Sequence, residues 1–452
     1  MTLLNELSAE VCQRARMSRD PRFDGRFFVA VKTTGIFCRP ICPANLPKEE
    51  NVEYFSSQAL AVSAGYRPCL RCRPESAPHS WAWKGAETTF LRALTLIEQG
   101  ELDGSLGTLA SRLGISDRYL RQLFQRHLGM PPKQYAQIQQ LMFAKQLLHT
   151  SQISITEVAY ASGFQSTRRF NDAFQKLFRL TPTQVRRERA ALPSRNHLSL
   201  AFRGPFDWAH MLDFYRLRAI EGMELVDEQS YQRHFVLGEG TGWFKASMAQ
   251  SHLDIEFEME RLSDLRHLVA RLRRMFDLDA DLISIEAHLE QLAPGLVRRT
   301  GIRIPGVWNA WEAGVRAVLG QQVSVKAAIG QLNLLVSTLA ASEGSTRYFP
   351  TPEQVQMSDL SFLRMPERRK ETLKRLADYV RLHPMDSPMA WLSLSGIGPW
   401  TVDYAQLRGE SRSHCFLTGD LIVKKALAKF PQLTAESVAP WGSYATFHCW
   451  SH

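Results

Sequence analysis

The sequence predicts a multidomain protein that is mainly α-helical with α+β parts, and three observations carry this prediction. The chain has 452 residues, far more than one hydrophobic core usually serves. Four cysteines lie close together near the N-terminus. Helical periodicity dominates two separate stretches, residues 85–190 and 286–452, with a mixed stretch between them. We expect a small cysteine-bearing domain at 1–78, tandem helix-turn-helix units at 82–190, a small α+β domain at 196–285 and a helix-hairpin-helix domain at 286–452.

The composition fits globular domains that meet a polyanion. Apolar residues make up 44% of the chain and charged residues 22%. Residues 1–195 hold 27 Lys and Arg against 16 Asp and Glu, a net +11, whereas the remainder holds 28 against 29, a net −1. This asymmetry places nucleic-acid binding in the first half. The chain has no apolar run that could span a bilayer, no signal peptide and no disulfide framework, so we expect a cytoplasmic protein without a membrane partner.

The first domain carries two close cysteine pairs, Cys38-x-x-x-Cys42 and Cys69-x-x-Cys72. This is the spacing of a tetrahedral zinc site, and a purely structural zinc clip is one interpretation of it. Short strands such as 27–31, a helix at 57–64 and a linker at 74–78 complete the domain. Arginines flank the cysteines, as is expected where a zinc site meets DNA phosphate. These arginines are Arg39, Arg67 and Arg71.

The second domain contains two similar segments, residues 105–124 and 154–174. Each has a short helix, a glycine-bearing turn, a serine N-cap and a second helix, which is the anatomy of a helix-turn-helix. Solvated helical hairpins are the alternative, but two such units within a basic region favour DNA binding. The polar residues of the second helices that we expect to face a major groove are Arg118, Arg121, Gln122, Arg168, Arg169 and Asn171.

A linker at 191–195 leads into the α+β domain, whose expected strands are 198–202, 233–237 and 253–258 and whose expected helices are 207–216 and 263–276. In the last domain, Gly396-Ile397-Gly398 lies between two expected helices. Its backbone N–H groups can point at one DNA phosphate. Asp420 follows in an apolar stretch, where it is either a helix N-cap or a catalytic carboxylate.

These residues resemble known families. Residues 19–72 resemble the zinc domain of the Ada family of methylphosphotriester methyltransferases, and residues 85–190 resemble AraC-type helix-turn-helix pairs. The resemblance implies that Cys38 accepts a methyl group and that Cys38, Cys42, Cys69 and Cys72 bind one Zn²⁺, which is both structural and activating. Four thiolates on Zn²⁺ carry a net −2 charge, and methylation lowers this to −1. Repair would therefore tighten DNA binding and become a transcription signal. The Pro-Cys-His-Arg motif of a second Ada methyltransferase domain is absent from the chain.

Residues 197–452 resemble the AlkA family of alkylation-repair glycosylases. The resemblance implies that Asp420 is the catalytic aspartate of a flipped-base reaction and that Trp400, Tyr404 and Trp450 form the base pocket. Without the resemblance, core packing is the better interpretation of these aromatics. Trp400 stands where bifunctional relatives carry a lysine, which implies hydrolysis without strand cleavage. Only the second aspartate of the AlkA doublet is kept, as Gly419-Asp420.

The Gly320-Gln321-Gln322-Val323-Ser324 segment is similar to the AlkA loop that fills the gap left by the flipped base. AlkA places a leucine where this chain has Gln322. The glycines of the hairpin, Gly396 and Gly398, and the two glutamines of the loop, Gln321 and Gln322, are the expected DNA contacts of this domain.

Together the resemblances imply a bacterial, nucleoid-associated alkylation-response protein. It would accept methyl groups from DNA methylphosphotriesters, activate transcription and release alkylated purines as a DNA-3-methyladenine glycosylase II type hydrolase. Its partners would be alkylated duplex DNA, promoter DNA and, for an activator, RNA polymerase. Two alternatives stay open: a damage-sensing transcription regulator whose glycosylase-like half only binds DNA, and a glycosylase whose zinc domain is merely a DNA anchor.

Overall fold

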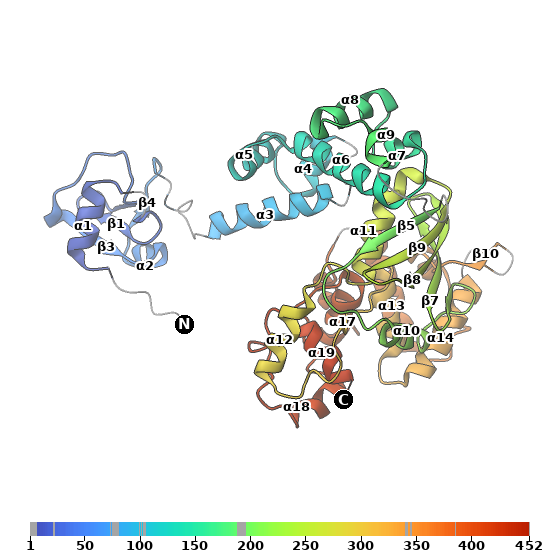
Figure 1. The fold of residues 1–452 in the computed structure, drawn as a ribbon. Helices are drawn as coiled ribbons and strands as arrows, with labels where there is room; N and C mark the ends of the chain where they lie inside the picture. Colours follow the sequence, from blue (N-terminus) through green and yellow to red (C-terminus); the bar gives the residue numbers. More distant parts are fainter. Residues whose placement is uncertain are drawn as a thin grey trace. The chain divides into compact units, whose positions relative to one another are not determined.

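A computed structural model describes residues 7–20, 23–72, 74, 81–98, 100, 102, 105–187, 196–339, 342–343, 346–384 and 386–451 (Figure 1). The chain divides into two compact units, residues 1–139 and 140–452. The boundary falls inside helix α6 (Pro132–Thr150). The expected linkers at 74–78 and 191–195 lie, apart from Pro74, outside the described residues. No helix among the described residues combines the length and the apolar character needed to cross a membrane.

The cysteine domain is built on a four-stranded sheet in the order β3-β1-β2-β4. Strand β1 is buried on both faces, because alternate residues enter different apolar clusters: Val29 packs near Cys12, whereas Phe28 and Ala30 pack with Phe37. The expected helix at 57–64 is present, and the Ser57 side chain caps its N-terminus. The elements are α1 (Ala9–Met17), β1 (Phe28–Val31), β2 (Ile36–Cys38), η2 (Glu49–Asn51), β3 (Val52–Phe55), α2 (Gln58–Ser63) and β4 (Arg67–Pro68).

Both expected helix-turn-helix units are present. The first packs its apolar residues, Leu120 and Phe124 among them, with Phe90 of the preceding helix. The second begins with a capping box between Ser154 and Glu157 and buries Phe170. The elements are α3 (Trp81–Glu98), α4 (Leu106–Arg112), α5 (Asp117–Leu128), α7 (Ile155–Ala161), α8 (Thr167–Phe178) and α9 (Pro182–Arg187).

The α+β domain contains a five-stranded antiparallel sheet in the order β5-β9-β8-β7-β6. The three expected strands are present, within a few residues of their expected ends. Strand β8 was not expected, because its start is glycine-rich and lacks strict alternation, and neither was the three-residue β6. The core of the sheet is continuous with that of the second helix-turn-helix unit, so residues 153–185 pack with the sheet. The elements are β5 (His197–Ala201), α10 (Trp208–Arg216), β6 (Glu224–Val226), β7 (Ser230–Leu237), β8 (Gly240–Met248), β9 (His252–Met259), η4 (Leu262–Asp264) and α11 (Leu265–Met275).

The remaining residues form mainly helices in two apolar clusters, and α13 is buried over most of its length. The first helix of the expected hairpin is a six-residue 3₁₀ helix rather than an α-helix, because the Ser387-Pro388 start and the glycine turn leave room for little more than one turn. The elements are α12 (Leu282–Leu292), α13 (Ala310–Gly320), α14 (Val325–Leu339), β10 (Ser342–Glu343), β11 (Thr346–Arg347), α15 (Pro352–Met357), α16 (Glu367–Leu382), η5 (Pro388–Ser393), α17 (Pro399–Glu410), α18 (Leu421–Leu427) and α19 (Gly442–Trp450).

A buried ionic network joins the sheet to the helical part. Arg233 of β7 contacts Glu224 at 2.8 Å and Glu312 of α13 at 2.5 Å. Arg316, one turn further along α13, contacts Glu312 at 2.8 Å and Glu224 at 3.1 Å. All four side chains are at most 5% exposed. The expected α+β and helical domains are therefore locked together by charges that are costly to separate.

Candidate functional site

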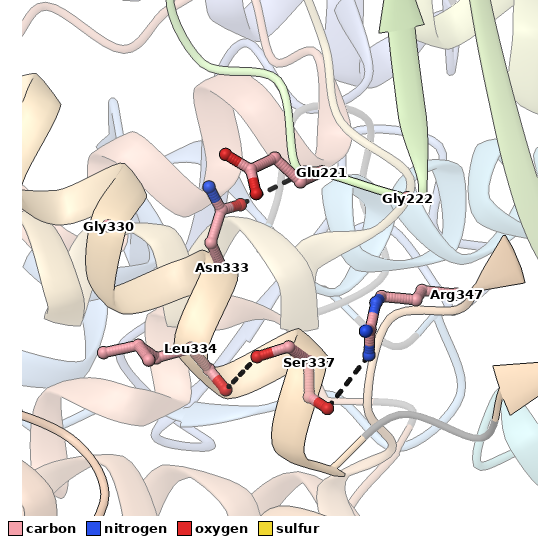
Figure 2. A pocket seen from close by; sticks show the side chains of 7 residues that line it. All are labelled: Glu221, Gly222, Gly330, Asn333, Leu334, Ser337 and Arg347. Carbon is pink, nitrogen blue, oxygen red and sulfur yellow. Dashed lines mark hydrogen bonds between the residues drawn. The ribbon is translucent and has the colours of Figure 1, made fainter. Parts of the chain in front are cut away.

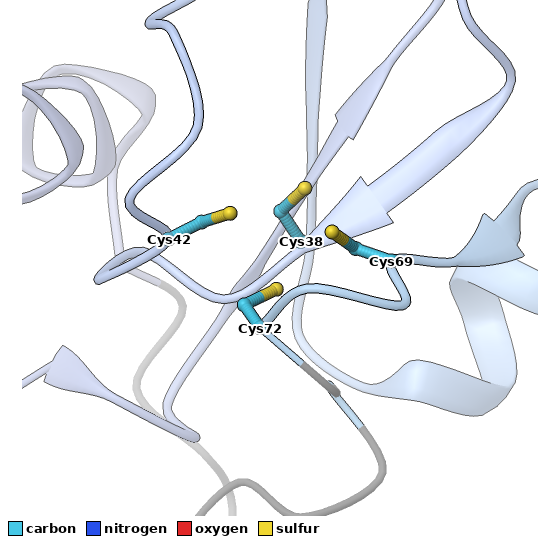
Figure 3. A group of neighbouring side chains, drawn as sticks. All are labelled: Cys38, Cys42, Cys69 and Cys72. Carbon is cyan, nitrogen blue, oxygen red and sulfur yellow. The ribbon is translucent and has the colours of Figure 1, made fainter.

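The four cysteines of the first domain converge on one point. Cys38 ends β2 and Cys69 follows β4, and these strands are parallel neighbours, with the Cys69 amide donating to the Phe37 carbonyl at 3.0 Å. Cys42 and Cys72 come from the two following turns. All four sulfurs lie within 4.8 Å of one another, and none forms a disulfide. Figure 3 shows the four side chains directed toward a common centre.

The cluster fits a zinc ion, because thiols packed this closely oppose one another's ionisation. The hydrogen bond with Cys72, together with burial, raises the pKa of the Cys38 thiol. The same hydrogen bond lowers the pKa of Cys72 to about 6. A central Zn²⁺ would remove this competition by holding every sulfur as a thiolate. The Arg39 amide also donates to the Cys72 sulfur at 3.4 Å, an outer-shell bond typical of metal sites.

The three arginines beside the cysteines have different environments. The Arg39 guanidinium donates to both carboxylate oxygens of Asp24 and to the Cys72 carbonyl at 3.3 Å. It is therefore engaged inside the domain, where it holds the cysteine turn, rather than extended toward a partner. Arg67 and Arg71 are exposed beside the cluster, as a phosphate contact requires.

The polar residues expected to face a DNA groove are all exposed. They lie on the sides of α5 and α8 opposite the buried Leu120, Phe124, Phe170 and Phe174. Ser116 caps α5 by accepting from the Tyr119 amide, whereas Ser166 makes no side-chain cap bond at α8. The exposed set is Arg118, Arg121 and Gln122 on α5 and Arg168, Arg169 and Asn171 on α8.

Asp420 lies at the N-terminus of α18, where it is a helix cap and also an aromatic contact. Its Oδ1 accepts from the Ile422 amide at 2.9 Å, from the Val423 amide at 3.3 Å and from the Trp450 indole at 3.1 Å. Asp420 is therefore a helix N-cap, which was the alternative to a catalytic carboxylate. The indole contact adds what a cap alone does not need, a link to one of the expected pocket residues.

Of the three expected pocket aromatics, Trp450 contacts this carboxylate directly, and the other two form a stacked pair near the preceding residue. Trp400 and Tyr404, one turn apart on α17, stack with ring centroids 5.3 Å apart. Trp400 also lies against Gly419, since a Cβ on that glycine would be 3.9 Å from the indole. Trp450 approaches from α19. The three rings are partly buried and pack at the edge of the apolar cluster of this part of the chain.

Three further residues of this site escaped the sequence reasoning. Phe214 of α10 stacks with Trp450, and the guanidinium of Arg218 lies 3.7 Å from the centre of the Phe214 ring. Arg408 donates to the Tyr404 hydroxyl at 2.9 Å. Burial by itself would raise the pKa of the Tyr404 hydroxyl. The positive charges of Arg408 and Arg218 outweigh this effect, so the pKa of Tyr404 is lowered overall. The only signal in the sequence was the helical spacing of Tyr404 and Arg408, because Phe214 and Arg218 belong to the α+β domain.

Of the two glycines in the hairpin turn, only Gly396 occupies a position that requires glycine. Gly396 has φ +92, and a Cβ there would be 2.1 Å from the Thr372 hydroxyl. Gly398 begins α17 and has open space around it. The Gln321 amide donates to the Gly396 carbonyl and to the Thr401 hydroxyl, each at 3.2 Å. The loop after α13 is therefore tied to the hairpin that carries Trp400.

A separate surface pocket contains none of the expected site residues (Figure 2). Within it the Glu221 amide donates to Asn333, and Arg347 donates to the Ser337 carbonyl. These bonds join β11 and the segment before β6 to α14. The pocket is lined by Glu221, Gly222, Gly330, Asn333, Leu334, Ser337 and Arg347.

Family models match three stretches of the chain. Residues 11–75 match the metal binding domain of Ada, residues 109–188 match a helix-turn-helix domain, and residues 197–309 match the AlkA N-terminal domain. These stretches agree with the positions of the cysteine cluster, the paired helices and the sheet.

Some relatives match nearly the whole chain and others match part of it. The chain is 34% identical over 475 residues to the probable bifunctional transcriptional activator/DNA repair enzyme AlkA of Mycobacterium tuberculosis, across 98% of this chain and 96% of that protein. It is 33% identical to DNA-3-methyladenine glycosylase 2 of Escherichia coli, across 56% of this chain and 96% of that one. It is 34% identical to the bifunctional transcriptional activator/DNA repair enzyme Ada of Escherichia coli, across 38% of this chain and 47% of that one.

Proposed function

The chain belongs to the family of bifunctional transcriptional activator/DNA repair enzymes, and from this premise we propose that its two sites answer the same kind of damage. The cysteine cluster takes methyl groups from methylated DNA phosphates, and the paired helix-turn-helix units bind promoter DNA in response. The site around Asp420 releases alkylated purines, 3-methyladenine first. The observation that carries the proposal is the hydrogen bond from the Trp450 indole to Asp420, with the Trp400 indole beside the neighbouring Gly419 and stacked on Tyr404.

In the first reaction the Cys38 sulfur attacks the methyl carbon of a phosphotriester. A sulfur–carbon bond forms, the carbon–oxygen bond breaks, and its electron pair stays on the phosphate oxygen. The four cysteines would hold one Zn²⁺, which supplies thiolates at neutral pH. Cys38 and Cys69 are partly exposed, whereas Cys42 and Cys72 are buried, so a DNA phosphate can reach the first pair and the assignment of the acceptor to Cys38 follows from the resemblance. Methylation removes one negative charge from a surface that faces DNA, so affinity for DNA rises.

In the second reaction the flipped purine lies among Trp400, Tyr404 and Trp450. Breaking the base–sugar bond leaves positive charge on the sugar, which the Asp420 carboxylate stabilises while water attacks. The Trp450 indole and the α18 amides fix the position of the carboxylate. Trp400 offers no amine for a Schiff base, so the product is an intact abasic strand.

A base-release assay tests the second reaction. Methylated duplex DNA is incubated with the protein and with Asp420→Asn, which keeps the helix cap because asparagine also caps. Asp359→Asn is the matched control, since Asp359 also accepts a backbone amide in the helical half. We expect the wild-type protein to release 3-methyladenine and Asp420→Asn to release it at least about 100-fold more slowly. Asp359→Asn should release it at the wild-type rate, and both variants should keep the DNA affinity of the wild-type protein.

A binding-only role is the second candidate, and the cap bonds of Asp420 favour it. No release by zinc-loaded wild-type protein would support that candidate. Full-rate release by Asp420→Asn would instead refute the catalytic role of Asp420. A mass measurement tests the first reaction: Cys38 should gain one methyl group from methylated DNA, and Cys38→Ser should gain none. Methylation of another cysteine instead would refute the assignment of Cys38.

A further inference from the structure

Arg218 brings a cation from the α+β domain to the aromatic site around Asp420. Its guanidinium lies 3.7 Å from the centre of the Phe214 ring. That ring stacks with Trp450 at a centroid distance of 6.3 Å, and the Trp450 indole donates to Asp420 at 3.1 Å. A short series of contacts therefore joins Arg218 to the carboxylate on which the proposed base release depends.

The guanidinium of Arg218 is only partly satisfied inside the protein. Within the described part of the chain it forms one hydrogen bond, from Nη1 to the Phe214 carbonyl at 3.3 Å, and no ion pair with a carboxylate. Burial, together with the charges of Arg408 and Arg316, lowers the pKa of Arg218 to about 10, so the side chain is still charged at neutral pH. The residue is also partly exposed, so an acceptor on a bound ligand can reach its remaining N–H groups.

The neighbours of Arg218 indicate which part of the DNA would meet it. The guanidinium lies over Phe214, and its charge also acts on the Tyr404 hydroxyl. Aromatic rings bind the flat face of a base rather than a phosphate. A guanidinium can only donate hydrogen bonds, so it favours a base edge that carries acceptors and disfavours one that carries an amino group. A 6-oxopurine presents O6 and N7 side by side, which is the pair that arginine contacts bidentately in DNA.

We propose that Arg218 is a specificity-determining residue, which donates to O6 and N7 of a flipped 6-oxopurine and so favours 6-oxopurines over 6-aminopurines in binding. This inference rests on the proposed glycosylase function, in which the flipped base lies among the aromatic rings. The contact matters most for a neutral base, because its bond to the sugar is stronger than that of a cationic methylated purine and the reaction needs more binding energy. 3-Methyladenine, whose bond is already weakened, can still be released first.

A double-mutant cycle between protein and base isolates this contact. The full-length protein and Arg218→Met, which keeps a flexible stem but has no donor, are titrated with duplexes that carry a base on a 2′-fluoroarabinose sugar, which resists hydrolysis. The base is either hypoxanthine or purine, which lacks O6, and it stands opposite difluorotoluene, with which neither pairs well. Fluorescence anisotropy gives the dissociation constants. The wild-type protein should bind the hypoxanthine duplex about tenfold more tightly, whereas Arg218→Met should show less than about a twofold difference.

Arg216→Met is the matched control, because Arg216 lies on the same helix, is exposed and pairs with Asp213. It should keep the tenfold ratio of the wild-type protein. A second measurement needs no variant: 7-deazahypoxanthine, which lacks the N7 acceptor, should bind the wild-type protein about tenfold more weakly than hypoxanthine does.

Equal binding of the three bases by the wild-type protein would overturn the inference, as would equal ratios in the wild-type protein and Arg218→Met or loss of the ratio in Arg216→Met. Binding is measured here without hydrolysis, so a failure of the proposed glycosylase activity would appear in the base-release assay and not in this ratio.

Discussion

Replacing Glu312 by glutamine should destabilise the second unit by about 3 kcal/mol. Burial by itself would raise the pKa of this carboxyl. The guanidinium groups of Arg233 and Arg316 have the larger effect, and they lower the pKa from its ordinary 4.5 to about 2. A carboxyl with such a change is stabilised in its charged form by about 3 kcal/mol. Glutamine would leave the two arginines with Glu224 alone, so a positive charge would be buried without a partner.

The pH dependence follows from the direction of the pKa change. A lowered pKa in the folded state gives stability that is present above pH 4.5 and is lost as the pH falls toward 2. Urea unfolding of the full-length protein, with hydrogen exchange of α13 to identify the transition, measures the difference. Glu371→Gln is the control, because the exposed Glu371–Arg375 pair contributes about 0.3–0.5 kcal/mol. A Glu312→Gln cost equal to that of the control would refute the reasoning.

Three other predictions concern the hairpin, a buried carboxyl and the metal centre. Gly396→Ala should cost roughly 2–4 kcal/mol through the clash with Thr372 and the positive φ, Thr372→Ala should recover part of it, and Gly398→Ala, which has open space, should cost under about 1 kcal/mol. Equal costs for the two glycine variants in urea unfolding would contradict this. Burial raises the pKa of Asp277 from its ordinary 3.8 to about 7, so its contribution to stability is full below about pH 4 and is lost as the pH rises through 7. Asp277→Asn should therefore gain stability relative to wild type between pH 5 and 8, and parallel stability–pH curves would exclude this role. Chelation of zinc should expose four thiols to titration while the buried Cys12, Cys415 and Cys449 stay unreactive, and release of fewer than four would show that the cluster does not hold the metal.

The sequence was most informative where function depends on local spacing. The two cysteine pairs predicted the cluster because four ligands must surround one ion, and the pairing of β2 with β4 then fixed Cys38 beside Cys69. The helix-turn-helix units were readable because their apolar residues recur at helical spacing. Arg39 shows the limit of such reasoning: its position beside Cys38 suggested a DNA contact, but the fold brings Asp24 within hydrogen-bonding distance of its guanidinium.

The sequence by itself determined that the four cysteines form one cluster and that paired helices follow them, and it predicted a glycine turn at Gly396. Only the tertiary structure decided that Phe214 and Arg218, from a different domain, reach the aromatic rings around Asp420. It also decided that Glu312 of α13 pairs with Arg233 of the sheet. The physical reason is the range of each interaction. Caps, turns and ligand spacing act within a few residues, whereas burial and ion pairing depend on which distant surfaces pack together.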